Sequence, residues 1–253
     1  MEIELINQLR GIAFIFMFIY HVFIFLKIQN NTNYLNNYFI NSIGIISRNI
    51  FILLVGVSLY LSYAKSEHFN SYKKKQLERS IKIYFIAIII TIFTYYTIYD
   101  YYIVFGVLHF ISISILLLHP FVNNFRILFI ILCICLYYNS KNIFIYSQYS
   151  FINYINSIIG FNIYKNTIDS FTLIKWIPNI IVGIFIGYII SNTIKNTKTN
   201  NTETEKKIEK KIENNNNNLG LYYISIIGKN TLILYLIHFP IIYFIIKFII
   251  KFI

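Results

Sequence analysis

Long, nearly uncharged apolar blocks are the feature that most restricts the fold of this 253-residue chain. Hydrophobic residues make up 57% of it, charged residues only 13%, and the mean hydropathy is +0.60. A soluble domain carries about 25% charged residues, whereas an α-helix that crosses a bilayer needs about 20 apolar residues. Because a spanning segment must satisfy its backbone hydrogen bonds internally, the blocks predict an all-α, polytopic transmembrane bundle that forms one domain over residues 1–253.

The apolar blocks predict about seven transmembrane helices. They cover residues 9–27, 43–63, 81–98, 102–119, 125–138, 172–191 and a segment within 221–253. Residues 139–170 mix Asn, Ser and Tyr with Ile and Phe, which is typical of an interfacial loop that holds a re-entrant or surface helix. Residues 192–218 end in five consecutive Asn and are expected to form a polar cytoplasmic linker, with a brief charged helix inside it. The last block is long enough to be broken near Gly228 or Pro240.

Lysine and arginine concentrate in two hydrophilic segments, residues 64–82 and 192–218, and these predict the orientation of the chain. Cytoplasmic loops are enriched in Lys and Arg, so both segments are expected in the cytoplasm. The amino terminus is then cytoplasmic, while the loops at 28–42 and 139–170 and the carboxyl terminus lie outside. The net charge is +12, and the Lys residues that produce it lie in short loops next to the apolar blocks. We therefore expect the lipid bilayer, and not nucleic acid, to be the partner of these residues.

Neither the cysteines nor the amino terminus indicates a secreted or metal-binding protein. Cys133 and Cys135 are two residues apart, which places them on different faces of a helix, so no disulfide and no metal site is expected. The first apolar block follows Glu2 and Glu4 and precedes no small-residue cleavage site, which favours a retained helix over a signal peptide. The sequence therefore predicts a multi-pass integral protein, with the cell membrane as its expected location.

Two ionisable residues in the first predicted helix share one of its faces. Arg10 and His21 are eleven residues apart, close to three helical turns, and the helical rise separates them by roughly 16 Å. Arg10 then lies at the cytoplasmic rim and His21 lies beyond the middle of the membrane. Polar groups at that depth are costly and usually face a cavity or one another, so this pair is the leading candidate for a functional site.

Other ionisable residues lie at related depths in the remaining predicted helices. His109 is roughly 10 Å from the outer end of its helix and His21 is roughly 18 Å above the inner boundary of a core ~30 Å thick, so the two histidines share a depth. Arg48 is slightly shallower, Asp169 lies at the outer mouth of its helix, and His238 lies near the middle of the last helix.

Each of these residues also has a purely structural interpretation. A hydrogen bond to a neighbouring helix would account for His109 or His238 taken singly. Snorkelling to the headgroups would account for Arg48, and N-capping of a helix would account for Asp169. Gly106, one turn before His109, leaves room on that face for a ligand or for a neighbouring helix.

Five segments together form a more specific pattern. They are INQLRGIAFIFMFIYH (6–21), FILLVGVSLYLS (51–62), FGVLHFI (105–111), DSFTLIKWIPNIIVGIFIG (169–187) and GKNTLILYLIHFP (228–240). In this order they resemble the catalytic domain of the heparan-alpha-glucosaminide N-acetyltransferase family and span nearly the whole chain. The related acyltransferase-3 family has the same Arg-x10-His spacing in its first helix. The chain departs from the family pattern at Asn7, Lys229 and Phe239, and it lacks the proline expected before Trp176.

The resemblance implies a membrane-embedded acyltransferase. Its donor would be acetyl-CoA or another acyl-CoA from the cytoplasm, and its acceptor a hydroxyl or amine of an extracytoplasmic carbohydrate. The residues with implied roles are His21 and His109 in catalysis, Arg10 and Arg48 in donor binding, and Asp169, Trp176 and His238 in acceptor binding. The chemistry is compatible with this, because an Arg at the inner rim suits anionic phosphates and an imidazole suits general base or nucleophilic catalysis.

Two other functions stay open at this stage. A small-solute or proton-coupled transporter would also place His and Arg inside the membrane, although the chain has no visible internal repeat. A structural membrane partner without activity is the second alternative. Release of a labelled acyl group from coenzyme A distinguishes the acyltransferase from both. The sequence also leaves open a homo-oligomer and the identity of the acceptor.

Overall fold

The computed structural model describes every residue except 1, 31–37, 142, 163–166, 201–218 and 253. Over these residues it is all-α. The helices are α1 (Glu2–Asn30), α2 (Tyr38–Ala64), α3 (Phe69–Thr97), α4 (Val107–Leu118), α5 (Phe125–Lys141), α6 (Ser150–Ile159), α7 (Leu173–Asn200), α9 (Leu219–Lys229) and α10 (Thr231–Phe252), with 3-10 turns η2 (Tyr99–Tyr101) and η3 (His119–Phe121). The predicted linker at 192–218 lies mostly outside the described residues, as does its charged helix.

Five of the described helices are long and apolar enough to cross a membrane. They are α1, α2, α3, α7 and α10, and they make the protein a multi-pass integral membrane protein. The expected count of about seven is not confirmed. Helix α4 has 12 residues, which corresponds to about 18 Å, and α5 has 17. Helix α6 lies inside the predicted interfacial loop.

Helices α3 and α4 begin at different places from those predicted. Helix α3 starts at Phe69 instead of residue 81, because the Lys, Gln, Glu and Arg residues of the basic segment are good helix formers. Helix α4 starts at Val107 instead of residue 102, since the residues before it form η2 and an extended segment. The backbone of that segment is paired: Ile168 N–H donates to Tyr101 O and Phe171 N–H donates to Phe105 O, both at 3.1 Å.

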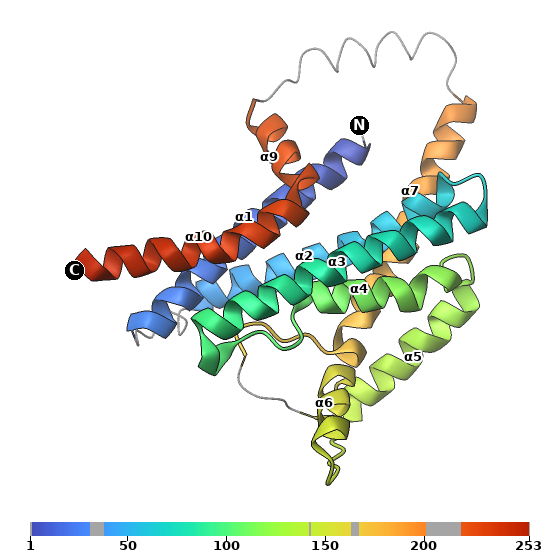
Figure 1. The fold of residues 1–253 in the computed structure, drawn as a ribbon. Coiled ribbons are helices and arrows are strands. Elements are labelled where there is room, and N and C mark those ends of the chain that lie inside the picture. The colour runs from blue at the N-terminus through green and yellow to red at the C-terminus, as the bar shows by residue number, and fades with distance from the viewer. Residues whose placement is uncertain (1, 31–37, 142, 163–166, 201–218, 253) are drawn as a thin grey trace. The chain divides into compact units, whose positions relative to one another are not determined.

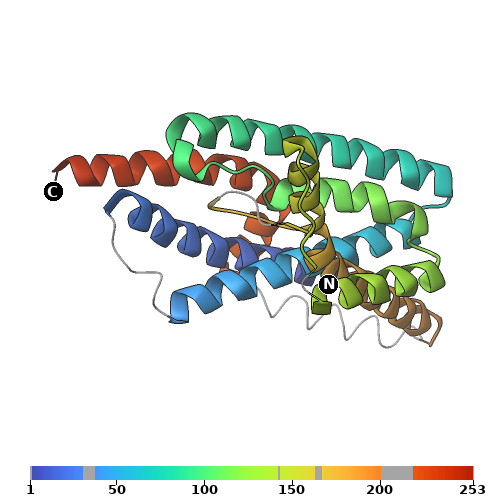
Figure 2. The same ribbon diagram turned by 90° about the horizontal axis from the view of Figure 1, so that it is seen from below.

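The chain divides into two compact units. Unit 1 comprises Met1–Leu54 and Tyr188–Ile253, and unit 2 comprises Val55–Gly187. In unit 1, α9 and α10 pack along α1, and both views show α10 beside α1 (Figures 1 and 2). The predicted break in the last apolar block occurs next to Gly228, between Lys229 and Thr231, whereas Pro240 stays inside α10.

Glycines allow the close approach of α9 to α1 in unit 1. A Cβ on Gly228 would overlap the backbone carbonyl of Asn7, and a Cβ on Gly11 would overlap the carbonyl of Ile224. Small residues at such crossings let two helix backbones come into direct contact, as in other membrane bundles. Helix α2 joins the same unit through Ser47, whose hydroxyl donates to Ala13 O at 2.7 Å.

Helices α3 and α4 pack side by side in unit 2. The buried residues of α3 recur every three or four positions from Tyr72 to Thr94, which marks one face of the helix. Polar groups on this face have partners on the neighbouring helices: Ser80 Oγ contacts Ser112 Oγ at 3.0 Å, and Gln76 Nε2 donates to Ser62 Oγ at 2.9 Å. Such interhelical hydrogen bonds fix how the helices are aligned.

Candidate functional site

Two buried histidines from distant parts of the sequence meet in unit 1. His21 on α1 is 4% exposed and His238 on α10 is 2% exposed. His21 Nδ1 lies 3.3 Å from His238 Nε2, and the two ring centroids are 5.1 Å apart. The sequence indicates both residues as candidates for the site but does not predict their contact. Their 217-residue separation gives no signal of proximity, and the packing register of α10 against α1 cannot be read from one sequence.

Aromatic side chains enclose this histidine pair. Phe239 lies 4.8 Å from the His21 ring, and Phe14 and Tyr235 lie 5.9 Å and 4.9 Å from the His238 ring. Phe239, one of the departures from the family pattern, is fully buried. The pair therefore sits in a largely apolar environment, where hydrogen bonds and charges act more strongly than in water.

The second hydrogen bond of His238 fixes which nitrogen of its neutral ring carries the proton. His238 Nδ1 lies 2.6 Å from the carbonyl oxygen of Tyr235, which can only accept, so Nδ1 carries the proton. His238 Nε2 is then an acceptor, and it can accept a proton that His21 carries on Nδ1. This chain of hydrogen bonds leaves His21 Nε2 as the nitrogen with a basic lone pair.

Two arginines of unit 1 lie near this pair or on its helix. Arg48 on α2 donates from Nε to Gly44 O at 3.2 Å, and its guanidinium carbon lies 6.0 Å from the centre of the Tyr20 ring. Arg48 is also within electrostatic range of His21. Arg10 lies 3.5 Å from the side-chain oxygen of Asn7 and is partly exposed. In α1, Arg10 precedes His21 by eleven residues, so the two share the predicted helical stripe.

The remaining predicted site residues belong to unit 2. His109 lies in the first turn of α4, packed edge-on against Tyr84 at 5.7 Å and beside Phe105 at the same distance. The Trp176 ring lies 5.1 Å from that of Phe171. The structure thus groups His21, His238, Arg10 and Arg48 within one unit and His109, Asp169 and Trp176 within the other. The predicted common depth of His21 and His109 stays a prediction.

Asp169 caps a helix, although not the one that follows it in the sequence. Its Oδ2 accepts a hydrogen bond from Val107 N–H at 3.0 Å, at the start of α4 and 62 residues away. A carboxylate at a helix amino terminus satisfies an unpaired N–H and interacts favourably with the helix dipole. A Cβ on Gly106 would lie 2.9 Å from the same oxygen, so the space left by this glycine admits the Asp169 carboxylate.

The comparison with protein families decides the assignment. The family described as heparan-alpha-glucosaminide N-acetyltransferase, catalytic, matches residues 3–240. The chain belongs to this family. Membership in the heparan-alpha-glucosaminide N-acetyltransferase family confirms the resemblance and indicates a transmembrane acetyltransferase that uses acetyl-CoA. No curated protein and no solved structure matches the chain significantly.

The matched region includes both groups of residues described above. Two departures from the family pattern, Asn7 and Phe239, lie in unit 1 beside candidate site residues: Asn7 Oδ1 lies 3.5 Å from Arg10, and Phe239 packs on His21. Among the residues that the structure describes, no cluster of three or more His, Cys, Asp or Glu side chains is arranged to hold a metal ion. Cys133 is exposed and Cys135 is buried, and both are free thiols.

Proposed function

We propose that the protein transfers an acetyl group from cytoplasmic acetyl-CoA to an amine or hydroxyl of a sugar on the other side of the membrane. The observation that carries this proposal is the buried, hydrogen-bonded pair of His21 and His238 in a member of an acetyltransferase family. A family assignment alone would give the reaction class. The histidine pair adds a group that can take up and return a proton inside the membrane.

His21 is the general base in this proposal. The acceptor's N–H or O–H gives its proton to His21 Nε2 while the acceptor atom attacks the thioester carbonyl. The C–S bond then breaks, the acetyl group stays on the acceptor, and the proton on His21 passes to the departing thiolate to give free coenzyme A. The ring returns to its neutral form, so no other reactant is consumed.

His238 acts as a positioning residue. By accepting the proton of His21 Nδ1 it keeps the ring in the tautomer with a basic Nε2, and its own bond to Tyr235 O holds it in place. In other enzymes, a group that orients a catalytic imidazole in this way contributes strongly to the rate. The resemblance implies that His238 binds the acceptor. We propose the positioning role instead, because the two ring nitrogens of His238 contact Tyr235 O and His21.

The two arginines have donor-side roles in the proposal. Arg48, whose guanidinium carbon lies 6.0 Å from the ring of Tyr20 beside His21 in α1, stabilises the negative charge that develops on the thioester oxygen. Arg10, nearer the expected cytoplasmic end of α1, attracts the phosphates of the donor. His109 and Trp176 are proposed acceptor contacts. Asp169 supports His109, since its bond to Val107 fixes the helical turn that carries this histidine.

An assay in sealed vesicles tests the proposal. Purified protein in proteoliposomes is given acetyl-CoA labelled in the acetyl group, together with glucosamine as the acceptor. The proposal expects label on the sugar and an equal amount of free coenzyme A thiol. A labelled solute that crosses the membrane intact, with no thiol released, would instead establish the transporter.

A further inference from the structure

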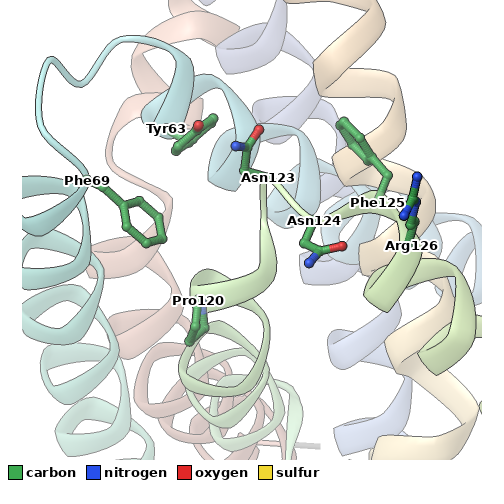
Figure 3. Close-up of a pocket in the computed structure, with 7 residues that line it drawn as sticks. All are labelled: Tyr63, Phe69, Pro120, Asn123, Asn124, Phe125 and Arg126. Carbon is green, nitrogen blue, oxygen red and sulfur yellow. The ribbon is translucent and has the colours of Figure 1, made fainter.

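A cavity of about 820 Å³ lies in unit 2, and none of the proposed catalytic, donor-binding or acceptor-binding residues lines it. It is lined by the side chains around the α2–α3 connection and by the turn that leads into α5 (Figure 3). Three lining residues are aromatic (Tyr63, Phe69 and Phe125), and three others are polar (Asn123, Asn124 and Arg126). A volume of this size is typical of sites for small molecules and cofactors.

Packing behind the cavity fixes its aromatic rings. Phe69 is stacked on Tyr72 with the planes 15° apart and the centroids at 6.0 Å, and Tyr63 packs edge-on against the same ring at 5.6 Å. Tyr72 is 1% exposed, and its hydroxyl has no hydrogen-bond partner within the described part of the chain. On the other side, Phe125 lies 5.6 Å from Phe185. The rings therefore form preformed flat surfaces, on which a planar base can stack.

Two cationic side chains lie at this cavity. Arg126 lines it, and Lys73 Nζ lies 4.5 Å from the centre of the Phe69 ring. Arg126 is the second residue of α5, and a cation at the amino-terminal end of a helix interacts unfavourably with the helix dipole. Arg126 therefore does not stabilise α5 at this position. The neighbouring segment adds Lys65, Lys74 and Lys75 against Glu67. An anion, such as a phosphate, is the ligand that this arrangement favours.

We infer that the cavity binds the adenine nucleotide portion of the acyl-CoA donor. The base would stack on the aromatic rings, Asn123 and Asn124 would hydrogen-bond its edge, and Arg126 would pair with a phosphate. This inference rests on the proposed function for the identity of the donor. It agrees with the predicted orientation, because the basic segment next to the cavity is the one expected in the cytoplasm, where acetyl-CoA is available.

An anionic phospholipid headgroup offers the same phosphate chemistry without the base. The aromatic surfaces favour the nucleotide, since a headgroup gains little from stacking. The test therefore needs ligands that distinguish a nucleotide site from a headgroup site. Adenosine 3′,5′-bisphosphate is a fragment of coenzyme A with both base and phosphates, whereas inorganic pyrophosphate has the charge but no base. Nanodiscs made with and without phosphatidylglycerol show whether an anionic lipid competes with the nucleotide for the cavity.

Titration calorimetry on the full chain in zwitterionic nanodiscs is the first measurement. Adenosine 3′,5′-bisphosphate is expected to bind the unmodified protein more tightly than pyrophosphate. Arg126→Gln and Phe69→Leu should each weaken this binding roughly tenfold, by loss of a charged hydrogen bond and of a stacking surface. Lys141→Gln, at the other end of α5, is the matched control and should leave binding unchanged. Both test positions are exposed, and Phe69→Leu keeps an apolar side chain beside Tyr72.

Equal binding of the nucleotide by the Arg126→Gln, Phe69→Leu and unmodified proteins would overturn the inference. The inference would also be overturned if pyrophosphate bound as tightly as the nucleotide. A third contrary result is that phosphatidylglycerol abolishes nucleotide binding to the unmodified protein but not to Arg126→Gln. Either of these two results would identify a site for a lipid headgroup.

Kinetics separate this inference from the proposed function. If Arg126→Gln raises the KM for acetyl-CoA but leaves transfer from S-acetylpantetheine unchanged, both are supported. Nucleotide binding without any acetyl transfer would refute the function and leave the nucleotide site standing. Acetyl transfer with an unchanged KM for acetyl-CoA in Arg126→Gln would refute the site and leave the function standing.

Discussion

At the scale of single residues, the candidate site is held by hydrogen bonds that the sequence could not show. The spacing of Arg10 and His21 predicts one helical stripe, because that depends only on helix geometry. The bond between His21 and His238 depends on which turn of α10 packs against α1, and a single sequence holds no record of that register. For the same reason, Asp169 was expected at the start of its own helix, whereas it caps α4.

Replacing His238 should separate positioning from packing. His238→Gln keeps an acceptor for the proton of His21, whereas His238→Phe keeps the aromatic volume without any acceptor. We expect kcat to fall by roughly 10²-fold or more in the Phe variant and substantially less in the Gln variant, with little change in the KM for acetyl-CoA. Steady-state kinetics on both variants measure this. Equal losses in the two variants would mean that His238 serves only to fill space.

Removing the carboxylate of Asp169 should destabilise unit 2. Asp169→Ala leaves the Val107 N–H without its partner, and loss of a capping side chain costs about 1 kcal/mol. Asp169→Asn retains a capping oxygen and should lose less. Thermal unfolding followed by the fluorescence of Trp176, the single tryptophan, is a suitable measurement. An Asp169→Ala protein as stable as the unmodified one would contradict this role for the carboxylate.

At the scale of elements, the apolar blocks predicted where most helices lie but not where every helix begins. Residues 9–27 and 43–63 fall inside α1 and α2, since long hydrophobic runs leave few alternatives. The predicted start of α3 was wrong because hydropathy marks where a segment is apolar, whereas a helix can continue through a charged segment of good helix formers. The cavity beside Phe69 was not predicted, because it forms only when the ends of α2, α3 and α5 come together.

The crossing of α9 and α1 offers a test with an internal control on one helix. Gly228→Ala places a methyl group on the backbone of Asn7, whereas Gly220→Ala meets nothing within 4 Å. Overpacking of this kind typically costs 1–3 kcal/mol, so Gly228→Ala should lower the thermal midpoint by several degrees. Gly220→Ala should leave it unchanged or raise it slightly, because alanine favours a helix. If both variants unfolded at the same temperature, the helices would not be in contact at Gly228.

At the scale of the whole molecule, the predicted orientation is insensitive to the helix count. Helices α4 and α5 follow one another, so the loops outside this pair keep their sides whether both cross the membrane or neither does. The basic segment 64–82 and the linker 192–218 are therefore expected on the same side for seven crossings and for five. The orientation itself stays a prediction.

Cysteine labelling in intact cells tests this orientation. In a background with Cys133 and Cys135 replaced by serine, a cysteine at Tyr146 should react with a membrane-impermeant maleimide. A cysteine at Lys74 should react only after the cells are opened. Both positions are exposed in the structure, so a difference between them reports the side of the membrane. The opposite labelling pattern would invert the orientation and place the basic segment outside.

The central claim is that the buried imidazole of His21 carries the proton in acetyl transfer. The most direct measurement is the rate at which labelled acetyl groups pass from acetyl-CoA to glucosamine in proteoliposomes, compared between the His21→Ala and His68→Ala variants. His68 lies at the exposed start of α3 and is the matched control. Loss of a general base should slow transfer by roughly 10²- to 10⁴-fold in His21→Ala and leave His68→Ala unaffected. Transfer by His21→Ala at the unmodified rate would contradict the claim.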